Sequence, residues 1–599
     1  MKKQKKRAAK ICRIGGQALI EGIMMQGATA TAISVRTPDG TIVTEAKRHK
    51  SAGVWGKIPL VRGVIAFVAS LVNGVRCIMK SAEQAFPDEE QPSAAATTVS
   101  CILGVVIAVA LFMLLPGWIA DVIAQFVKMN ILVRSLIEGA IRIAVFVGYL
   151  ALVSAMKDIR RTFMYHGAEH RTINCYERGL DINVANVQSC STRHNRCGTT
   201  FLFFVMIMSI IVFSLAAWAV QLIVGFVPGK WVLMCVRLLC LPLVAGLSYE
   251  LLRFLALLPD NKFVDIFRAP GLALQKLTTR RPDDQMAEVA IEAFRAVLVM
   301  DANPSYPERN FGEYVLCEVR DRLYERFDKA GIDRSDADWI ICRAAAVRRS
   351  QLSEPRIIEK ETYASILETA QKRLEGSPLD YIFGESEFFG LKIKVNQDVL
   401  IPRPETELLA EQALEFVRKR QSENPDRRVS ALDMCCGSGC IAAVLARMSG
   451  AKVTAADISE KAVAVAKSNL DGTDAEVRVS DMFASFEEEK FDLIVCNPPY
   501  VASGDMEGLQ SEVKREPAAA LDGGADGMDF YRIIAASARG FLMPDGALML
   551  EAGLGQAERI IEMLRATGDY GEVYSLKDLE GADRMVIAYA ADAYKAENL

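Results

Sequence analysis

The chain has 599 residues, a length that predicts several domains. Its formal net charge of −4 excludes the strong overall positive field that draws a protein to nucleic acid. The 51% hydrophobic content and the mean hydropathy of +0.18 exceed those of an ordinary soluble protein, and the excess lies almost wholly before residue 260.

The first half of the chain contains apolar stretches long enough to cross a bilayer. The basic run at residues 1–10 is not followed directly by the apolar core of a signal peptide. The apolar stretch 63–75, which Arg62 and Arg76 bracket, is too short to span, and we expect it to be interfacial or re-entrant. About four spanning helices are predicted, at residues 99–120, 136–156, 199–229 and 231–258.

The positions of Lys and Arg predict the orientation of these helices. Residues 157–196 carry seven of these basic residues, whereas the two connections on the other side carry three. The amino terminus and the segment after Arg253 are also basic. We therefore expect a multi-pass protein of the cell membrane, with the lipid bilayer as a partner and with both termini in the cytoplasm.

The loop between the second and third predicted spans carries histidines and a cysteine in a metal-like pattern. His166-Gly-Ala-Glu169-His170 has the H-x-x-E-H spacing of inverted zinc peptidases, and on a helix its two imidazoles share one face. Imidazole and thiolate are ligand types that zinc accepts. The predicted ligands of a divalent metal such as zinc are His166, His170, His194 and Cys197. The alternative is that these polar residues hydrogen-bond lipid phosphates or the backbone.

Three stretches of the first half, residues 15–26, 165–197 and 274–284, resemble the YqhQ-type family of bacterial membrane proteins. Proteins of this family are described only as predicted metal-dependent enzymes. The resemblance covers about residues 10–300, as its motifs are placed. We assign residues 1–300 to a membrane domain with a cytoplasmic His/Cys loop.

A turn-rich segment at residues 301–312 precedes a small helical domain. Apolar residues recur at helical spacing from Leu316 to Phe327, and Ser335 predicts the cap of a second helix. Another helix is expected at residues 363–374. We assign residues 308–395 to this domain, in which packing alone explains the apolar stripe.

Residues 396–599 follow the order of a doubly wound α/β domain. An apolar strand at 431–434 leads into a glycine turn and a helix, and the next strand ends at Asp457, where a carboxylate can accept ribose hydroxyls. A third strand leads to residues 480–483, placed to line an adenine. A plain turn or a helix cap explains each feature alone, but their order indicates S-adenosylmethionine. The predicted cofactor-binding residues are Cys435, Cys436, Gly437, Ser438, Gly439, Asp457, Asp481, Met482 and Asn497.

The tetrapeptide Asn497-Pro498-Pro499-Tyr500 ends the apolar run 491–496 and is the predicted substrate site. The prolines end the strand and leave carbonyl groups without ladder partners. Asn497 Oδ1 and the Pro498 carbonyl can accept both hydrogens of a planar –NH2 group, and Tyr500 can pack against its plane. The predicted catalytic residues are Asn497, Pro498 and Tyr500. All four histidines lie before residue 195, so no imidazole base is available here.

Residues 378–384, 401–407, 497–500 and 516–532 resemble the HemK/PrmC family, from about residue 310 to 599. Members of this family methylate the glutamine amide of peptide-chain release factors. The resemblance implies a class I, Rossmann-like fold, S-adenosylmethionine as donor, release factors as partners, and N5-methylation of the glutamine in a Gly-Gly-Gln motif. Cys435 stands where the family usually has a first glycine, and its side chain is expected to crowd the methionine end of the cofactor.

Two other functions remain open. The same tetrapeptide serves adenine-N6 nucleic-acid methyltransferases, but these need a basic groove, and residues 487–489 are all Glu, so no direct nucleic-acid binding is expected. A membrane metalloprotein or tether, in which the methyltransferase fold only binds, is the other alternative. Residues 15–17 also read Gly-Gly-Gln, the tripeptide that the methyltransferase half is expected to recognise. A tight turn explains this match, and the alternative is self-modification of Gln17.

Overall fold

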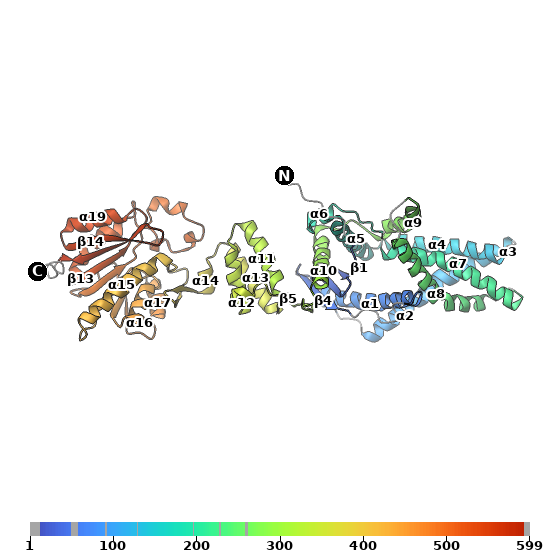
Figure 1. Ribbon diagram of the computed structural model, residues 1–599, viewed down its shortest axis with the longest axis horizontal. Helices are drawn as coiled ribbons and strands as arrows, with labels where there is room; N and C mark the ends of the chain where they lie inside the picture. Colours follow the sequence, from blue (N-terminus) through green and yellow to red (C-terminus); the bar gives the residue numbers. More distant parts are fainter. Residues whose placement is uncertain are drawn as a thin grey trace. The chain divides into compact units, whose positions relative to one another are not determined.

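The computed structural model describes residues 12–49, 58–89, 93–127, 130–195, 197–226, 229–257 and 262–591. The basic run at residues 1–10 lies outside the described residues. The chain divides into two compact units, which Figure 1 shows in sequence colours. The first unit comprises residues 1–319 and 350–363, and the second comprises residues 320–349 and 364–599.

The first unit begins with an antiparallel meander of four strands. In order these are β1 (Gly15–Leu19), β2 (Gly22–Gln26), β3 (Ala30–Arg36) and β4 (Ile42–Arg48). Helices α5 (Lys157–Glu177) and α10 (Asp284–Ala302) share a buried apolar cluster with the sheet, which includes Ile23, Tyr165 and Phe294. Gln17 lies within β1 and is paired with Met24, so the tight turn expected at residues 15–17 is wrong.

Five helices among the described residues are long and apolar enough to cross a membrane. They are α1 (Val61–Ala85), α2 (Ala94–Val109) continuing through a π-helical turn (Ala110–Leu114) into α3 (Leu115–Phe126), α4 (Ile131–Val153), α7 (Gly198–Val224) and α8 (Lys230–Leu257). The helix beyond the four expected spans is α1, whose apolar stretch 63–75 is expected from the sequence to be interfacial or re-entrant because Arg62 and Arg76 bracket it. The helix continues past Arg76 to Ala85, and Arg62 at its start bonds to Glu250 of α8 at 2.7 Å.

The second unit is built on a seven-stranded sheet in the order β11-β10-β9-β12-β13-β15-β14. Its strands are β9 (Ser430–Met434), β10 (Lys452–Asp457), β11 (Glu476–Val479), β12 (Phe491–Cys496), β13 (Leu542–Glu551), β14 (Tyr570–Lys577) and β15 (Asp583–Ala590). The first five strands run parallel, and β15 pairs antiparallel with both of its neighbours. The expected Rossmann-like fold is confirmed.

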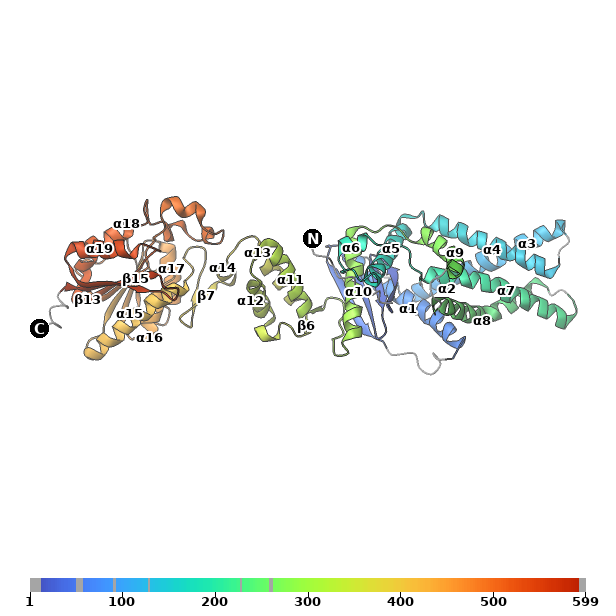
Figure 2. The ribbon, with the colours of Figure 1, turned by 45° about the horizontal axis from the view of Figure 1, so that its top comes forward.

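Helices cover both faces of this sheet (Figure 2). One apolar cluster joins the sheet to α15 (Pro404–Glu423), α16 (Cys440–Met448) and α17 (Glu460–Asn469), and a second cluster joins it to α18 (Asp529–Ser537) and α19 (Ala557–Thr567). The strand order reverses between β9 and its neighbours β10 and β12. In such sheets, ligands bind at the carboxyl ends of the strands where this reversal occurs.

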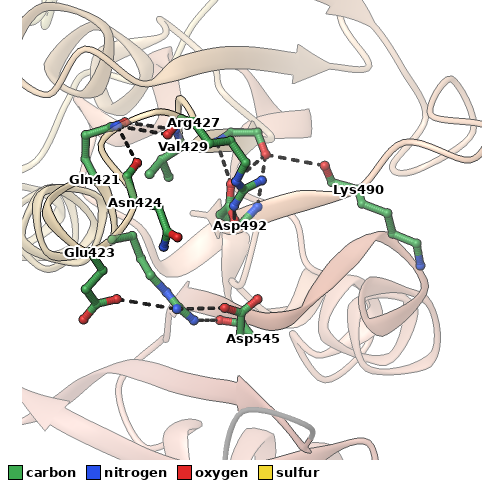
Figure 3. Close-up of polar contacts among 10 residues, drawn as sticks. Gln421, Glu423, Asn424, Arg427, Val429, Lys490, Asp492 and Asp545 are labelled. Carbon is green, nitrogen blue, oxygen red and sulfur yellow. Dashed lines mark hydrogen bonds and ion pairs between the residues drawn. The ribbon is translucent and has the colours of Figure 1, made fainter.

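The opposite, amino-terminal ends of β9 and β12 are joined by polar contacts (Figure 3). The buried carboxylate of Asp492 accepts the backbone N–H of Ser430 at 2.8 Å and also pairs with Arg427. Because these bonds pin the two strands at one end, the carboxyl ends of the strands are held in a fixed register.

A group of helices precedes the sheet, as expected. They are α11 (Leu316–Ala330), α12 (Arg334–Ala345), α13 (Lys360–Leu374) and α14 (Leu379–Phe383). The cap predicted at Ser335 is wrong by two residues, because the side chain of Asp333 accepts the N–H of Ser335 at 2.7 Å and caps α12. The division between the two compact units falls inside α11, at residues 319 and 320.

Candidate active site and candidate metal centre

A cavity of about 550 Å³ lies at the carboxyl ends of β9, β10 and β12. It collects most of the predicted site residues, although they come from separate segments of the chain. Those that line it are Cys435, Cys436, Gly437, Ser438, Asp457, Asp481, Met482, Asn497 and Pro499. Gly439, Pro498 and Tyr500 do not line it.

The glycine turn between β9 and α16 is fixed by its backbone conformation. Gly437 and Gly439 have φ values of 54° and 74°, in the region that glycine adopts without steric cost. A Cβ on Gly439 would lie 3.0 Å from Cβ of Ala466 in α17. Gly439 therefore permits close helix packing behind the turn, which explains why it lies outside the cavity.

Asp457 joins the end of β10 to the glycine turn. Its carboxylate accepts the backbone N–H of Gly437 at 2.9 Å and the N–H of Ser459 at 2.9 Å. Burial raises the pKa of this carboxyl group. The cap of α17 is Ser459, so the alternative that Asp457 is a helix cap is wrong. A carboxylate held at this edge of the cavity has the position that a ribose-binding acid needs.

Cys435 and Met482 face each other across part of the cavity wall, with 3.9 Å between the two sulfur atoms. Both have left-handed backbones, with φ values of 57° and 43°. Such a conformation is unfavourable for a residue with a Cβ and is concentrated at functional sites.

Replacing Cys435 with glycine is expected to strengthen S-adenosylmethionine binding by about threefold to tenfold. The substitution removes a side chain from the cavity and allows the left-handed backbone without strain. Isothermal titration calorimetry of the full chain measures the change. Cys342→Ala removes a thiol outside the cavity and is the control, and unchanged or weaker binding by the glycine variant would contradict the expectation.

The side chain of Asn497 is oriented by two consecutive hydrogen bonds that the sequence did not predict. Its Nδ2 donates to Thr406 Oγ1 at 3.2 Å, and Thr406 Oγ1 donates to Glu551 Oε2 at 2.7 Å. Glu551 is buried at the end of β13. Since the nitrogen of the Asn497 amide is used inside the protein, its oxygen Oδ1 is the atom available to a ligand.

Tyr500 is tied to the same acid. Its hydroxyl donates to Glu551 Oε1 at 3.3 Å, and the Arg584 guanidinium lies 5.8 Å from its ring centroid. Burial and the adjacent Glu551 raise the pKa of Tyr500 to about 12, so the hydroxyl stays neutral at physiological pH. The β12–β13 pairing sets Cys496 opposite Leu550, so Asn497, which follows β12, lies near Glu551, the last residue of β13. An acid at the end of an apolar strand was the available signal for Glu551.

In the first unit, two histidines of α5 and one cysteine converge. The ligand atoms of His166, His170 and Cys197 all lie within 4.8 Å of one another. His166 Nδ1 lies 2.9 Å from the Thr278 carbonyl oxygen, and His170 Nδ1 lies 2.6 Å from that of Thr192. These carbonyls hold a proton on each Nδ1, so both Nε2 atoms present lone pairs. This arrangement is typical of metal-binding histidines.

His194 does not join this group, although it was predicted as a fourth ligand. Its Nε2 lies 3.4 Å from Glu177 Oε2, and its ring centroid is 5.8 Å from that of His170. The buried Oε2 of Glu169 and the buried Nε2 of His170 have no hydrogen-bond partner among the described residues. The donor set of two imidazoles and one thiol fits zinc, with the Glu169 carboxylate beside it.

Both halves of the chain match known families. Residues 58–300 match the family described as "Protein of unknown function (DUF1385)", and residues 414–526 match "Methyltransferase small domain". A protein of Thermodesulfovibrio yellowstonii named release factor glutamine methyltransferase is 38% identical over 274 residues, which are 45% of this chain and 96% of that protein. The uncharacterized protein YqhQ of Bacillus subtilis is 32% identical over 305 residues, which are 48% of this chain and 93% of that protein. A solved methyltransferase of Pyrococcus furiosus is 20% identical with a TM-score of 0.26, covering 34% of this chain and 89% of that structure.

Proposed function

Because the chain belongs to the family of release factor glutamine methyltransferases and to the YqhQ family, we propose that it methylates release factors as a membrane-bound fusion. The methyl group is transferred from S-adenosylmethionine to the side-chain nitrogen N5 of the glutamine in a Gly-Gly-Gln motif. The observation that carries the proposal is the orientation of Asn497, which leaves Oδ1 as an acceptor at the cavity.

The residues around the cavity fit the donor. The turn at Gly437 and the carboxylate of Asp457 lie where the methionine and ribose parts of S-adenosylmethionine would be held. When bound, S-adenosylmethionine supplies a methyl group already activated by its sulfonium. Catalysis by this chain is therefore mainly alignment of the two reactants.

The tetrapeptide orients the substrate amide. Asn497 Oδ1 accepts one amide hydrogen at the cavity, which directs the nitrogen toward the donor and stabilises the positive charge that develops on it. The predicted second acceptor, the Pro498 carbonyl, belongs to a residue outside the cavity lining. Tyr500, anchored on Glu551, holds the tetrapeptide in place. The helices at residues 308–395 are assigned to recognition of the release factor.

Replacing Thr406 with valine is expected to lower the turnover number about tenfold, because it removes the hydroxyl that joins Asn497 to Glu551 at nearly constant volume. The amide of Asn497 is then free to rotate, while the affinity for S-adenosylmethionine stays unchanged. Steady-state kinetics with release factor measures both quantities. Thr406→Ser keeps the hydroxyl and is expected to restore most of the turnover, and equal rates for the two variants would contradict a positioning role.

A methyl-transfer assay tests the proposed substrate. The full chain is incubated with methyl-labelled S-adenosylmethionine and one of three acceptors: a release factor, the same factor with Ala in place of the motif glutamine, or adenine-containing duplex DNA. Label in the first acceptor alone supports the proposal. Label in DNA would favour the adenine-N6 alternative, and donor binding without transfer to any acceptor would favour a tether.

A second function belongs to the first half, where His166, His170 and Cys197 are proposed to bind zinc. Three protein ligands are the number found in catalytic zinc sites, which keep a fourth position for water or substrate. The support is the convergence of three donor atoms, two of them oriented by backbone carbonyls.

Four apolar segments, α2–α3, α4, α7 and α8, are proposed to span the cell membrane, with α1 interfacial or re-entrant and with both termini and the methyltransferase half in the cytoplasm. An even number of crossings agrees with the apolar cluster that the strands before α1 share with α5 and α10. The basic loop at residues 157–196 supports this orientation. With this proposed orientation, the methyltransferase half would share the cytoplasm with S-adenosylmethionine and release factors.

A further inference from the structure

A cluster of five charged side chains lies among helices α3, α4 and α8 of the first unit. Glu138 bonds to Arg142 at 2.8 Å and to Arg237 at 2.7 Å, and Asp121 pairs with Arg134. Three of the five are cationic and two are anionic, so the cluster carries one excess positive charge. Among apolar helices an uncompensated charge is costly and normally has a partner.

Of the two arginines that share Glu138, Arg237 is the one with a donor left without a partner among the described residues. Arg142 is well satisfied, because it also donates to the Phe112 carbonyl at 2.9 Å and lies 5.3 Å from the ring centroid of Phe213. Arg237 bonds to Glu138, but its Nε is buried without a hydrogen-bond partner among the described residues. Arg237 is therefore the guanidinium that can donate to a further anion.

A cavity of about 210 Å³ opens beside Arg237. Apart from Asp121, Arg134 and Arg237, its side-chain lining is apolar and includes Trp118 and Trp231, which are each 65% exposed. Exposed tryptophans are typical of the headgroup level of a membrane. Arg237 lies seven residues into α8, which is about 10 Å of helix below Lys230.

We propose that this cavity binds the phosphodiester of an anionic phospholipid, with Arg237 as the cation that holds it. The inference rests on the proposed insertion of these helices in a membrane. A phosphodiester carries one negative charge, which balances the cluster, and its two free oxygens suit a guanidinium. The apolar wall favours a lipid over free phosphate, because acyl chains cover it and an inorganic ion does not.

The test compares lipids on the full chain purified in a neutral detergent. Native mass spectrometry follows binding of phosphatidylglycerol and of phosphatidylcholine with the same acyl chains. Arg237→Gln is expected to reduce the preference for phosphatidylglycerol by roughly fivefold to tenfold. It leaves Glu138 paired with Arg142, so the helix bundle keeps its inner ion pair. Arg237→Lys is expected to retain most of the preference.

Arg62→Gln is the matched control, because it removes the same charge from an arginine outside the cavity. A preference unchanged in Arg237→Gln, or reduced equally in Arg62→Gln, would overturn the proposal. Displacement of the lipid by millimolar inorganic phosphate would identify a free-anion site and would also overturn it. Resistance of the wild-type chain to alkaline extraction from membranes tests insertion separately, and release-factor methylation is scored in the same variants.

Discussion

Replacing Asn497 with alanine is expected to lower the turnover number for release-factor methylation by a factor of about one hundred or more. The variant loses the acceptor that orients the glutamine amide and stabilises the charge developing on its nitrogen. The cavity wall around Gly437 and Asp457 is untouched. S-adenosylmethionine is therefore expected to bind within about threefold of the wild-type affinity, because donor and amide occupy different parts of the site.

Single-turnover kinetics and calorimetry separate these two effects. Asn424→Ala, which removes an amide outside the cavity, is the control for general destabilisation. Near-normal turnover in Asn497→Ala would refute the role given to Asn497. A loss of donor affinity as large as the loss of turnover would assign Asn497 to cofactor binding alone.

The convergence of the predicted cofactor-binding residues on one cavity was predictable because they follow strand ends in chain order. In a parallel sheet the carboxyl ends of neighbouring strands meet at one edge, so the glycine turn, Asp457 and Asn497 had to converge. The cavity at that edge includes all three. Local sequence is sufficient to predict which residues share a cavity when the sheet topology itself brings their segments together.

Thr406 and Glu551 were missed because their roles depend on distant segments. Thr406 lies 91 residues before Asn497, and Glu551 lies 145 residues after Thr406. The apolar strand before Glu551 indicates an acid at a strand end, but it does not indicate which side chains that acid contacts. Only the β12–β13 register brings Glu551 beside the tetrapeptide.

The length of helix α1 was underestimated for a similar reason. The apolar stretch of α1 looked too short because Arg62 and Arg76 bracket it. Arg62 is compensated by Glu250, which is 188 residues away. Long-range charge pairing is invisible to a hydropathy count, whereas the i, i+4 pair Glu138–Arg142 was predictable from spacing.

The His166–His170 pair was predictable for the same reason, since residues four apart share a helix face. His194 belongs to a loop, whose path no periodicity fixes. The structure directs its Nε2 to Glu177 instead. Three of the four predicted ligands therefore converge in the structure, and this difference sets the controls for the metal experiment.

The double variant His166→Ala, His170→Ala is expected to lose nearly all bound zinc. The wild-type chain is expected to hold about one zinc, and the double variant less than about a tenth of that, because two of three donors are gone. Inductively coupled plasma mass spectrometry of the protein, after dialysis against zinc-free buffer, measures the zinc content per chain. Methylation by the second unit is expected to continue, since none of its residues is changed.

The remaining histidines and Cys197 decide whether the loss is specific. His49→Ala and His194→Ala are expected to retain zinc, because neither ring joins the three converging atoms. With cobalt in place of zinc, the Cys197 thiolate should give a sulfur-to-metal charge-transfer band, and Cys197→Ser should remove it while the two imidazoles remain. Zinc retained by the double variant, or lost equally in His49→Ala, would contradict a site built on α5. Loss of zinc in His194→Ala would instead show that His194 is a fourth ligand, although the structure turns its imidazole toward Glu177.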